Sequence, residues 1–187
     1  MIVRCCVASI VALLLVAGCQ KQAASEPVAP PKSTAMPSTN ATPSAIPGWP
    51  PTKAQTKLQT MKIYVGPETV AAEVCMTQVQ IGTGMMFRKE MGENEGMLFV
   101  FGKPHRTSFY MKNTLLPLHV AYLDSEGTIL ELHELEPLNE APVEAATEKI
   151  QFVLEMNKGW FTRHNVSVGS IITCEAGRLR DAFRFGR

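Results

Sequence analysis

The sequence lacks an excess of charge of either sign. Its 18 lysines and arginines are set against 17 aspartates and glutamates, which leaves a formal net charge of +1. Proteins that bind nucleic acid rely on a strongly basic face that neutralises phosphates. This near-neutral balance gives no electrostatic reason to expect nucleic acid as a partner.

The sequence also lacks the short motifs of several common chemistries. It contains no Gly-x-Ser-x-Gly, no phosphate-cradling glycine-rich loop and no Cys-x-x-Cys pair. The four histidines are scattered without a His-x-x-x-His pair, and the methionines are better explained as core fillers than as Cu(I) ligands. We therefore predict no metal and no cofactor, assign no catalytic residue, and favour a non-enzymatic protein.

The first 19 residues have the organisation of a lipoprotein signal peptide. Arg4 is the only charge before an apolar run that ends at residue 18, too short to span a bilayer but as long as a signal-peptide core. The run ends in Val16-Ala17-Gly18-Cys19, which resembles the bacterial lipobox. We predict a signal peptide over residues 1–18 and a membrane anchor of acyl chains on Cys19.

The predicted anchor sets the expected location. A lipidated chain lies in the cell envelope, facing the periplasm or the cell surface, and Gln20 after the anchor favours the outer membrane over the inner one. Residues 19–57 form the expected anchor and tether. Eight of the thirteen prolines fall there, among alanine, serine and threonine, and this composition is typical of flexible segments that cannot bury a core.

One folded domain is expected over residues 58–176. Its class is α+β but mostly β: a compact single domain of short strands, barrel- or sandwich-like, with one or two short helices. Glycines weaken a helical pattern over residues 77–88, and residues 159–164 predict a short helical turn. Alternation and apolar runs predict strands at 61–65, 70–75, 96–101, 107–111, 118–124, 128–135, 149–156 and 170–174.

The remaining basic tail, residues 177–187, allows two interpretations. Leu179 and Phe183 would share a helical face flanked by arginines, which fits contact with anionic lipid or an acidic partner. A frayed chain end is the simpler alternative.

Two cysteines fall within the expected domain. Cys75 and Cys174 are an even pair in an oxidising compartment, and both lie in predicted strands. They form either a disulfide or two separate buried thiols, because a bridge also has to meet a strict distance requirement.

Several motifs then occur in the order typical of one family. They are Gly84-Met85-Met86-Phe87-Arg88, Glu95 to Phe101, Phe109 to Leu118, Asp124 to Ile129, Phe152 to Gly159 and Val168-Gly169-Ser170. Together these blocks resemble the domain-of-unknown-function family 192, also called uncharacterised protein family 0127, over nearly all of residues 61–175. The resemblance implies a small, mostly β domain that is often exported and has no accepted activity.

The chain departs from the pattern of that family at two positions. The aromatic pair is Phe109-Tyr110, where Phe-Trp is usual, and His119 stands where an aspartate usually follows Pro-Leu. If that aspartate served as a catalytic acid or a metal ligand, its role would be altered in this chain.

Six polar residues within or beside these motifs form the candidate ligand-binding set. They offer two cations for an anionic or sugar-like ligand, an amide, a hydroxyl, an imidazole and a carboxylate. A structural alternative pairs the arginine with the carboxylate and leaves the amide and the hydroxyl to shape a turn before Pro117. The six residues are Arg88, Lys112, Asn113, Thr114, His119 and Glu155.

Three functions remain open at this point. The first is an envelope module that binds a small polar or anionic ligand, a cell-wall component or a protein partner. The second is a hydrolase or lyase that acts on envelope carbohydrate, with His119 near Glu155 as general base. The third is a purely structural accessory protein.

Overall fold

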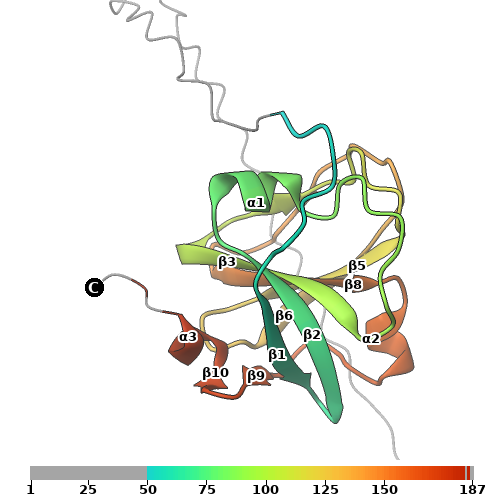
Figure 1. Cartoon of the computed structure of the whole chain (residues 1–187). Coiled ribbons are helices and arrows are strands. Elements are labelled where there is room, and N and C mark those ends of the chain that lie inside the picture. Colours follow the sequence, from blue (N-terminus) through green and yellow to red (C-terminus); the bar gives the residue numbers. More distant parts are fainter. Residues whose placement is uncertain (1–49, 184, 186–187) are drawn as a thin grey trace, which may run out of the picture. The chain divides into compact units, whose positions relative to one another are not determined.

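Strands dominate the structure, a computed structural model that describes residues 50–183 and residue 185 (Figure 1). The expected signal peptide, Cys19 and most of the expected tether lie outside these residues. The elements are β1 (Thr60–Val65), β2 (Glu68–Cys75), α1 (Gln78–Thr83), β3 (Glu95–His105), β4 (Ser108–Phe109), β5 (Leu118–Leu123), β6 (Ile129–Leu135), β7 (Val143–Glu144), β8 (Ile150–Asn157), α2 (Trp160–Arg163), β9 (Ile172–Cys174), β10 (Gly177–Arg178) and α3 (Leu179–Ala182).

Eight of these strands form one mixed sheet in the order β10-β9-β1-β2-β3-β8-β5-β6, and β4 pairs with β7 separately. The sheet curls so that Thr128, just before β6, bridges to Ile171, just before β9. The described residues form no closed barrel, and the expected mostly β, compact single domain is confirmed. None of the described helices is long and apolar enough to cross a membrane.

The neighbouring strands β2 and β3 are parallel, so the chain has to cross over between them. The crossover spans residues 76–94 and contains α1. Thr77 begins the helix with a capping box, in which its hydroxyl accepts from the Gln80 N–H. Gly84 ends the helix with a φ of +48°, which a glycine adopts without steric cost. The ambiguous segment 77–88 is therefore one short helix followed by a loop.

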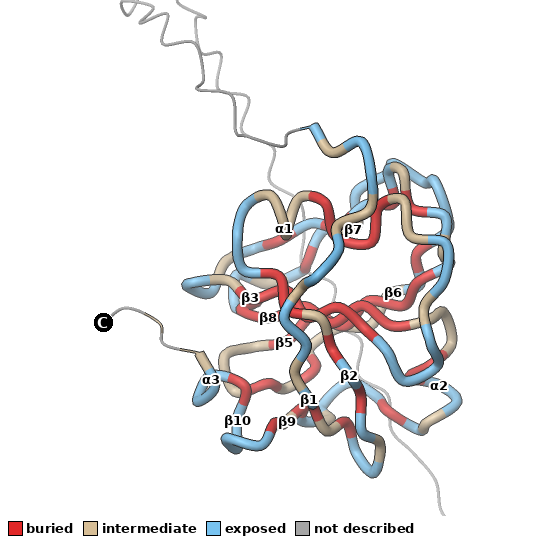
Figure 2. The backbone as a smooth tube through the Cα atoms, in the orientation of Figure 1, coloured by how far each residue is buried: buried red, intermediate tan, exposed pale blue. Residues whose placement is uncertain are grey.

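Each face of the sheet has its own apolar core. The central strands β5 and β8 contribute to both cores and are buried along almost their whole length (Figure 2). The first, called here the Trp160 face, packs Phe152, Leu154 and Met156 against α2 and α3. The second, called the Met97 face, packs Met97, Phe99 and Val153 beneath the crossover and β4. Because side chains alternate along a strand, Phe152, Leu154 and Met156 of β8 point to the Trp160 face, whereas Val153 and Glu155 between them point to the Met97 face.

The two domain cysteines are both free and buried. Cys75 packs into the Met97 face, whereas Cys174 packs into the Trp160 face. The disulfide considered above is therefore absent from this structure, because the sheet separates the two thiols. Burial raises the pKa of the Cys75 thiol to about 12, which leaves it protonated and a poor nucleophile.

The packed chain continues beyond the expected boundary at residue 176. Residues 177–182 add β10 and α3, and Leu179 is fully buried in the Trp160 face. Arg178 and Arg180 both pair with Glu126. This part of the basic tail is therefore held against the domain. The strand β3 also runs on to His105, through a shift in register, where Gly102-Lys103-Pro104 was expected to end it.

Candidate functional site

The most unusual polar group in the structure is the Glu155 carboxyl on β8. Glu155 lies opposite Met97 on β3 and Val120 on β5, so its neighbours across the strands are apolar. The side chain belongs to a residue only 4% exposed, and no described residue hydrogen-bonds its buried Oε2 atom. An unpartnered buried polar group is rare in native proteins and costs stability.

Burial also determines the charge of this carboxyl. Loss of hydration raises the pKa of Glu155 from 4.5 to about 8, and burial is the one cause of the shift. Among the described residues, no cation contributes to the shift by favouring the ionised form. Near pH 7 the carboxyl is therefore mostly protonated, and it can both donate and accept a hydrogen bond.

Glu155 is one of the residues that line a pocket between the Met97 face and the segments that cover it. The pocket has a volume of about 250 Å³ and opens to solvent. It has the apolar walls and few polar groups typical of small-molecule sites, although it is small for one. Its lining residues are Ile81, Gly82, Thr83, Gly84, Met85, Met86, Phe99, Thr107, Ser108, Phe109, Tyr110, Thr114 and Glu155.

Several loops close to this pocket have strained backbones that are tied together. Phe87, Asn113 and Leu138 all have φ between +54° and +63°, which is unfavourable for residues other than glycine. The Phe87 N–H donates to the Asn113 carbonyl at 2.8 Å, and the Leu138 N–H donates to the Thr114 carbonyl at 3.0 Å. Such strain persists where the surrounding structure enforces it, and it tends to occur at functional sites.

The last residues of the expected tether also reach this region. The Gln55 side-chain amide donates to the Gln80 carbonyl at 3.1 Å and to the Gly84 carbonyl at 2.9 Å. The Arg88 guanidinium in turn donates to the Gln55 carbonyl at 3.1 Å. Gln55 therefore fastens the end of α1, which forms one wall of the pocket.

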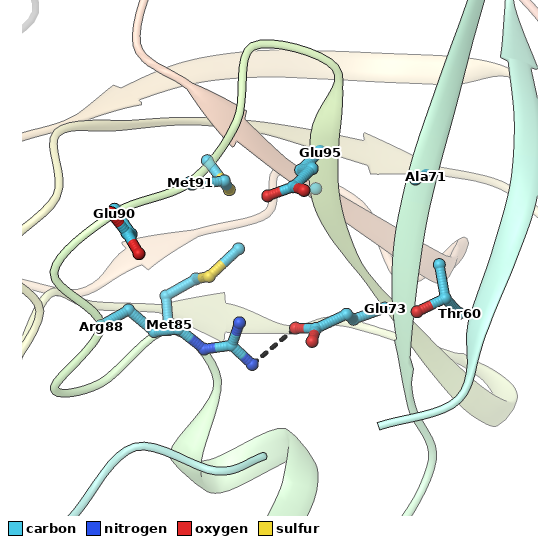
Figure 3. A pocket seen from close by; sticks show the side chains of 9 residues that line it. Thr60, Ala71, Glu73, Met85, Arg88, Glu90, Met91 and Glu95 are labelled. Atoms are coloured by element: carbon cyan, nitrogen blue, oxygen red, sulfur yellow. Dashed lines mark ion pairs between the residues drawn. The ribbon is translucent and has the colours of Figure 1, made fainter. Parts of the chain in front are cut away.

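Arg88 lines a second, smaller pocket of about 130 Å³, drawn in Figure 3. Its guanidinium pairs with Glu73 at 2.5 Å, so the pairing with Glu155 considered above is wrong. The buried Nε atom of Arg88 has no acceptor among the described residues. Glu90 and Glu95 line the same pocket, and an anion there would meet their repulsion.

The next three candidates are adjacent in sequence but differ in role. Lys112 is exposed and lies 3.7 Å from Glu140. Asn113 has the left-handed backbone described above. The buried Thr114 donates to the Lys112 carbonyl at 3.2 Å and lines the larger pocket. Asn113 and Thr114 thus shape a turn, as the structural alternative expected.

His119 lies on the opposite face of the sheet from Glu155. It pairs with Met156 across β5 and β8, and its ring packs edge-on against Phe161 at 5.1 Å. Burial lowers the pKa of His119 below 6.5, so the imidazole is neutral near pH 7. The expectation that His119 and Glu155 act as an acid–base pair is therefore wrong, because the sheet stands between them.

The structure brings together Thr114 and Glu155 from the six candidates, and it adds residues that the sequence did not single out. Thr83 from the crossover and Thr107 and Ser108 near β4 bring hydroxyls to the same pocket. The one sequence signal for them was that Thr107 and Ser108 directly precede the Phe109-Tyr110 pair. Within residues 50–183 and 185, no three acidic, cysteine or histidine side chains converge as metal ligands.

The two departures from the family pattern have different positions relative to the pocket. Tyr110 lines it, so the change from tryptophan alters its wall. His119 is on the far face of the sheet, so the change from aspartate does not reach the pocket.

Comparison with known proteins gives a family but no activity. The family model described as DUF192: Uncharacterized ACR matches residues 61–174. A solved structure of a proposed transcription regulator from Sinorhizobium meliloti 1021 is 29% identical, with a TM-score of 0.61, over 65% of this chain and 98% of that one. A protein of unknown function from Novosphingobium aromaticivorans is also 29% identical, with a TM-score of 0.59, over 62% and 85%. The search of curated proteins found no significant match.

Proposed function

Because the chain belongs to the DUF192 family, which is described as uncharacterised, we propose its function from the site alone: the domain is a binding module for a small polar molecule. The ligand would occupy the 250 Å³ pocket and hydrogen-bond to Glu155. The observation that carries this proposal is the Glu155 carboxyl, whose buried Oε2 atom has no hydrogen-bond partner among the described residues and which lines an open pocket.

The buried Glu155 carboxyl lowers the free energy of unfolding of the domain. A buried polar group without a hydrogen bond costs about 1–3 kcal/mol, a sizeable part of a typical domain stability of about 5–15 kcal/mol. A leucine would fill a similar volume without this cost. A ligand that hydrogen-bonds to Glu155 would remove the cost, and this gain would add to its affinity.

The pocket favours binding over catalysis and disfavours anions. Besides Glu155, its lining contains no histidine, cysteine, lysine or further carboxylate, so it lacks a second group of the kinds most used in acid–base catalysis. It has no lysine or arginine in its lining. The anionic ligand expected from Arg88 and Lys112 is therefore disfavoured, because each of these cations already faces a carboxylate elsewhere.

The regulator description of the Sinorhizobium protein does not extend to a proposal for this chain. A net charge of +1 offers little for phosphate binding. A small-molecule pocket is compatible with sensing, but the near-neutral composition gives no support for DNA binding by this chain.

A thermal-shift screen with neutral polyols, amides and small amines tests the proposed function. At least one compound class should raise the melting temperature of the protein by several degrees at about ten times its Kd. Glu155→Leu, which keeps the volume but removes the carboxyl, should abolish the shift. Lys112→Ala is the matched control outside the pocket and should leave the shift unchanged. A screen without any stabilising compound, or an equal shift in Glu155→Leu, would contradict the proposal.

We further propose that this module is held at the cell envelope by acyl chains on Cys19. The support is the Val16-Ala17-Gly18-Cys19 motif at the end of a short apolar run. The wild-type protein should fractionate with membranes, and mass spectrometry should find acyl chains on Cys19. Cys19→Ser should release the protein from the membrane fraction. An unmodified Cys19 in the wild-type protein would refute the anchor and leave the pocket unaffected.

A further inference from the structure

We propose, on the basis of the proposed function, that the polar group of the ligand is an organic ammonium ion on a short apolar stem. The first support is the set of hydrogen-bonding side chains in the pocket. They are the hydroxyls of Thr83, Thr107, Ser108, Tyr110 and Thr114 and the Glu155 carboxyl. Hydroxyls and carboxyls can all accept, and the lining has no obligate donor such as lysine, arginine or tryptophan. A ligand that supplies several donors fits this lining.

The end of α1 adds further acceptors. Ile81 and Gly82, in the last turn of the helix, line the pocket, and the last carbonyls of a helix have no partner within it. The neighbouring carbonyls are already occupied: Gln80 accepts from Gly84 and Gln55, and Thr83 accepts from Met86 at 3.0 Å. The carbonyl end of α1 therefore contributes to the lining of this pocket, and the partial negative charge of a helix C-terminus favours a cation over an anion there.

The apolar walls suit both the charge and the stem of such a ligand. Phe99 and Phe109 form an edge-on aromatic pair with ring centroids 4.8 Å apart, and both line the pocket. Aromatic faces attract cations, and the flexible thioethers of Met85 and Met86 adapt to apolar groups. A cavity of about 150 Å³ holds benzene, so this pocket admits a ligand of similar or slightly larger size.

Within residues 50–183, no cation is placed to act as a counter-ion for Glu155. Burial raises the pKa of Cys75 to about 12 and also raises the pKa of Tyr122, so both stay neutral near pH 7. The Tyr122 hydroxyl already donates to the Val143 carbonyl at 2.6 Å. Arg88 is neutralised by Glu73. A cation that ionises Glu155 would therefore have to come from the ligand.

Binding of an ammonium ion should release one proton from the protein. In the free protein Glu155 carries a proton near pH 7. When the ammonium enters, it keeps its own proton, and the carboxyl releases one proton to the buffer and forms the ion pair. Binding should therefore release about one proton at about pH 6.5 and almost none at about pH 9, where the carboxyl is already ionised.

Calorimetric titration with propylammonium and propan-1-ol tests the ligand class, because the two probes differ only in the polar end. Propylammonium should bind at least about tenfold more tightly than the alcohol, which corresponds to about 1.4 kcal/mol. The propylammonium titration is then repeated at about pH 6.5 in two buffers of different ionisation enthalpy. The difference between the two binding enthalpies should correspond to about one proton released per ligand bound. Glu155→Gln should weaken ammonium binding by at least about tenfold and remove the proton release, while the control Lys112→Ala, outside the pocket, should keep both the binding and the release.

The outcomes separate the two proposals. If propan-1-ol binds as tightly as propylammonium, and Glu155→Leu abolishes both, the ammonium class is wrong and the proposed function stands. If propylammonium binds without proton release, or binds equally well to Glu155→Gln, the ammonium class is also wrong. If neither probe binds and the thermal-shift screen is blank, both proposals fail.

Discussion

A rise in pH from about 5 to about 8 should destabilise the folded protein through one group, the Glu155 carboxyl. The unfolded chain loses this proton near its ordinary pKa of 4.5, whereas the folded domain keeps it up to about pH 8. Between these values the folded state binds one more proton than the unfolded state. The free energy of unfolding should therefore fall by about 1.4 kcal/mol per pH unit in this window, and by several kcal/mol across it.

The variant Glu155→Gln isolates this effect, because its amide does not titrate. Urea unfolding of both proteins at several pH values should give a difference in stability that grows in favour of the variant from about pH 5 to about pH 8 and then levels off. The difference is needed because His119 acts in the opposite direction. The pKa of the His119 imidazole is lowered in the folded protein. This group therefore favours the folded state at pH values above 6.5, and that stability is lost as the pH falls. Parallel pH profiles for the two proteins would show that Glu155 is not buried as described.

Trp160→Ala should cause the largest loss of stability of any single truncation in the domain. Trp160 is fully buried at the start of α2, stacks on His164 at 4.4 Å and packs edge-on against Phe161 at 5.4 Å. Its indole N–H donates to the Asn94 side chain at 3.0 Å. Removal of such a side chain costs about 3–5 kcal/mol, through lost burial and a cavity that the sheet cannot close.

The control for this prediction is a truncation on the surface. Val168→Ala, at a residue 58% exposed, should change the free energy of unfolding by less than about 0.5 kcal/mol. Urea unfolding at a single pH measures both variants. Similar values for the two would mean that the Trp160 face is not the core that supports the sheet.

Most of the strands could be predicted from the sequence, because their signal is local. Period-two alternation and apolar runs located all eight predicted strands to within a few residues, although β4 is reduced to Ser108–Phe109. The parallel pairing of β2 and β3 had no such signal. Parallel order depends on where the crossover places the next strand, and that is decided by packing over the whole sheet.

The sequence predicts the face of the sheet on which Glu155 lies, but not the face on which His119 lies. The shared face of Phe152, Leu154 and Met156 already implies that Glu155 points the other way. The strand that contains His119 is buried at all six residues, so its pattern does not distinguish the two faces. Only the register between β5 and β8, in which His119 pairs with Met156, shows that His119 lies on the face opposite Glu155.

The partner of Arg88 could not be predicted at all. The sequence offers no rule for choosing between Glu73 and Glu155, two carboxylates on different strands. The structure resolves the choice, because Glu73 on β2 lines the same small pocket as Arg88, whereas Glu155 lines the larger one.

The most direct test of the account is a carbon-13 NMR titration of the Glu155 carboxyl, assigned by its absence in Glu155→Gln. The account predicts a midpoint near pH 8 in the free protein, well above the ordinary value of 4.5, because burial removes the hydration of the carboxylate. Saturating propylammonium should move that midpoint downward. A midpoint near 4.5 without any ligand would mean that water or a cation already stabilises the ionised carboxyl. A ligand would then gain no extra affinity from contact with Glu155.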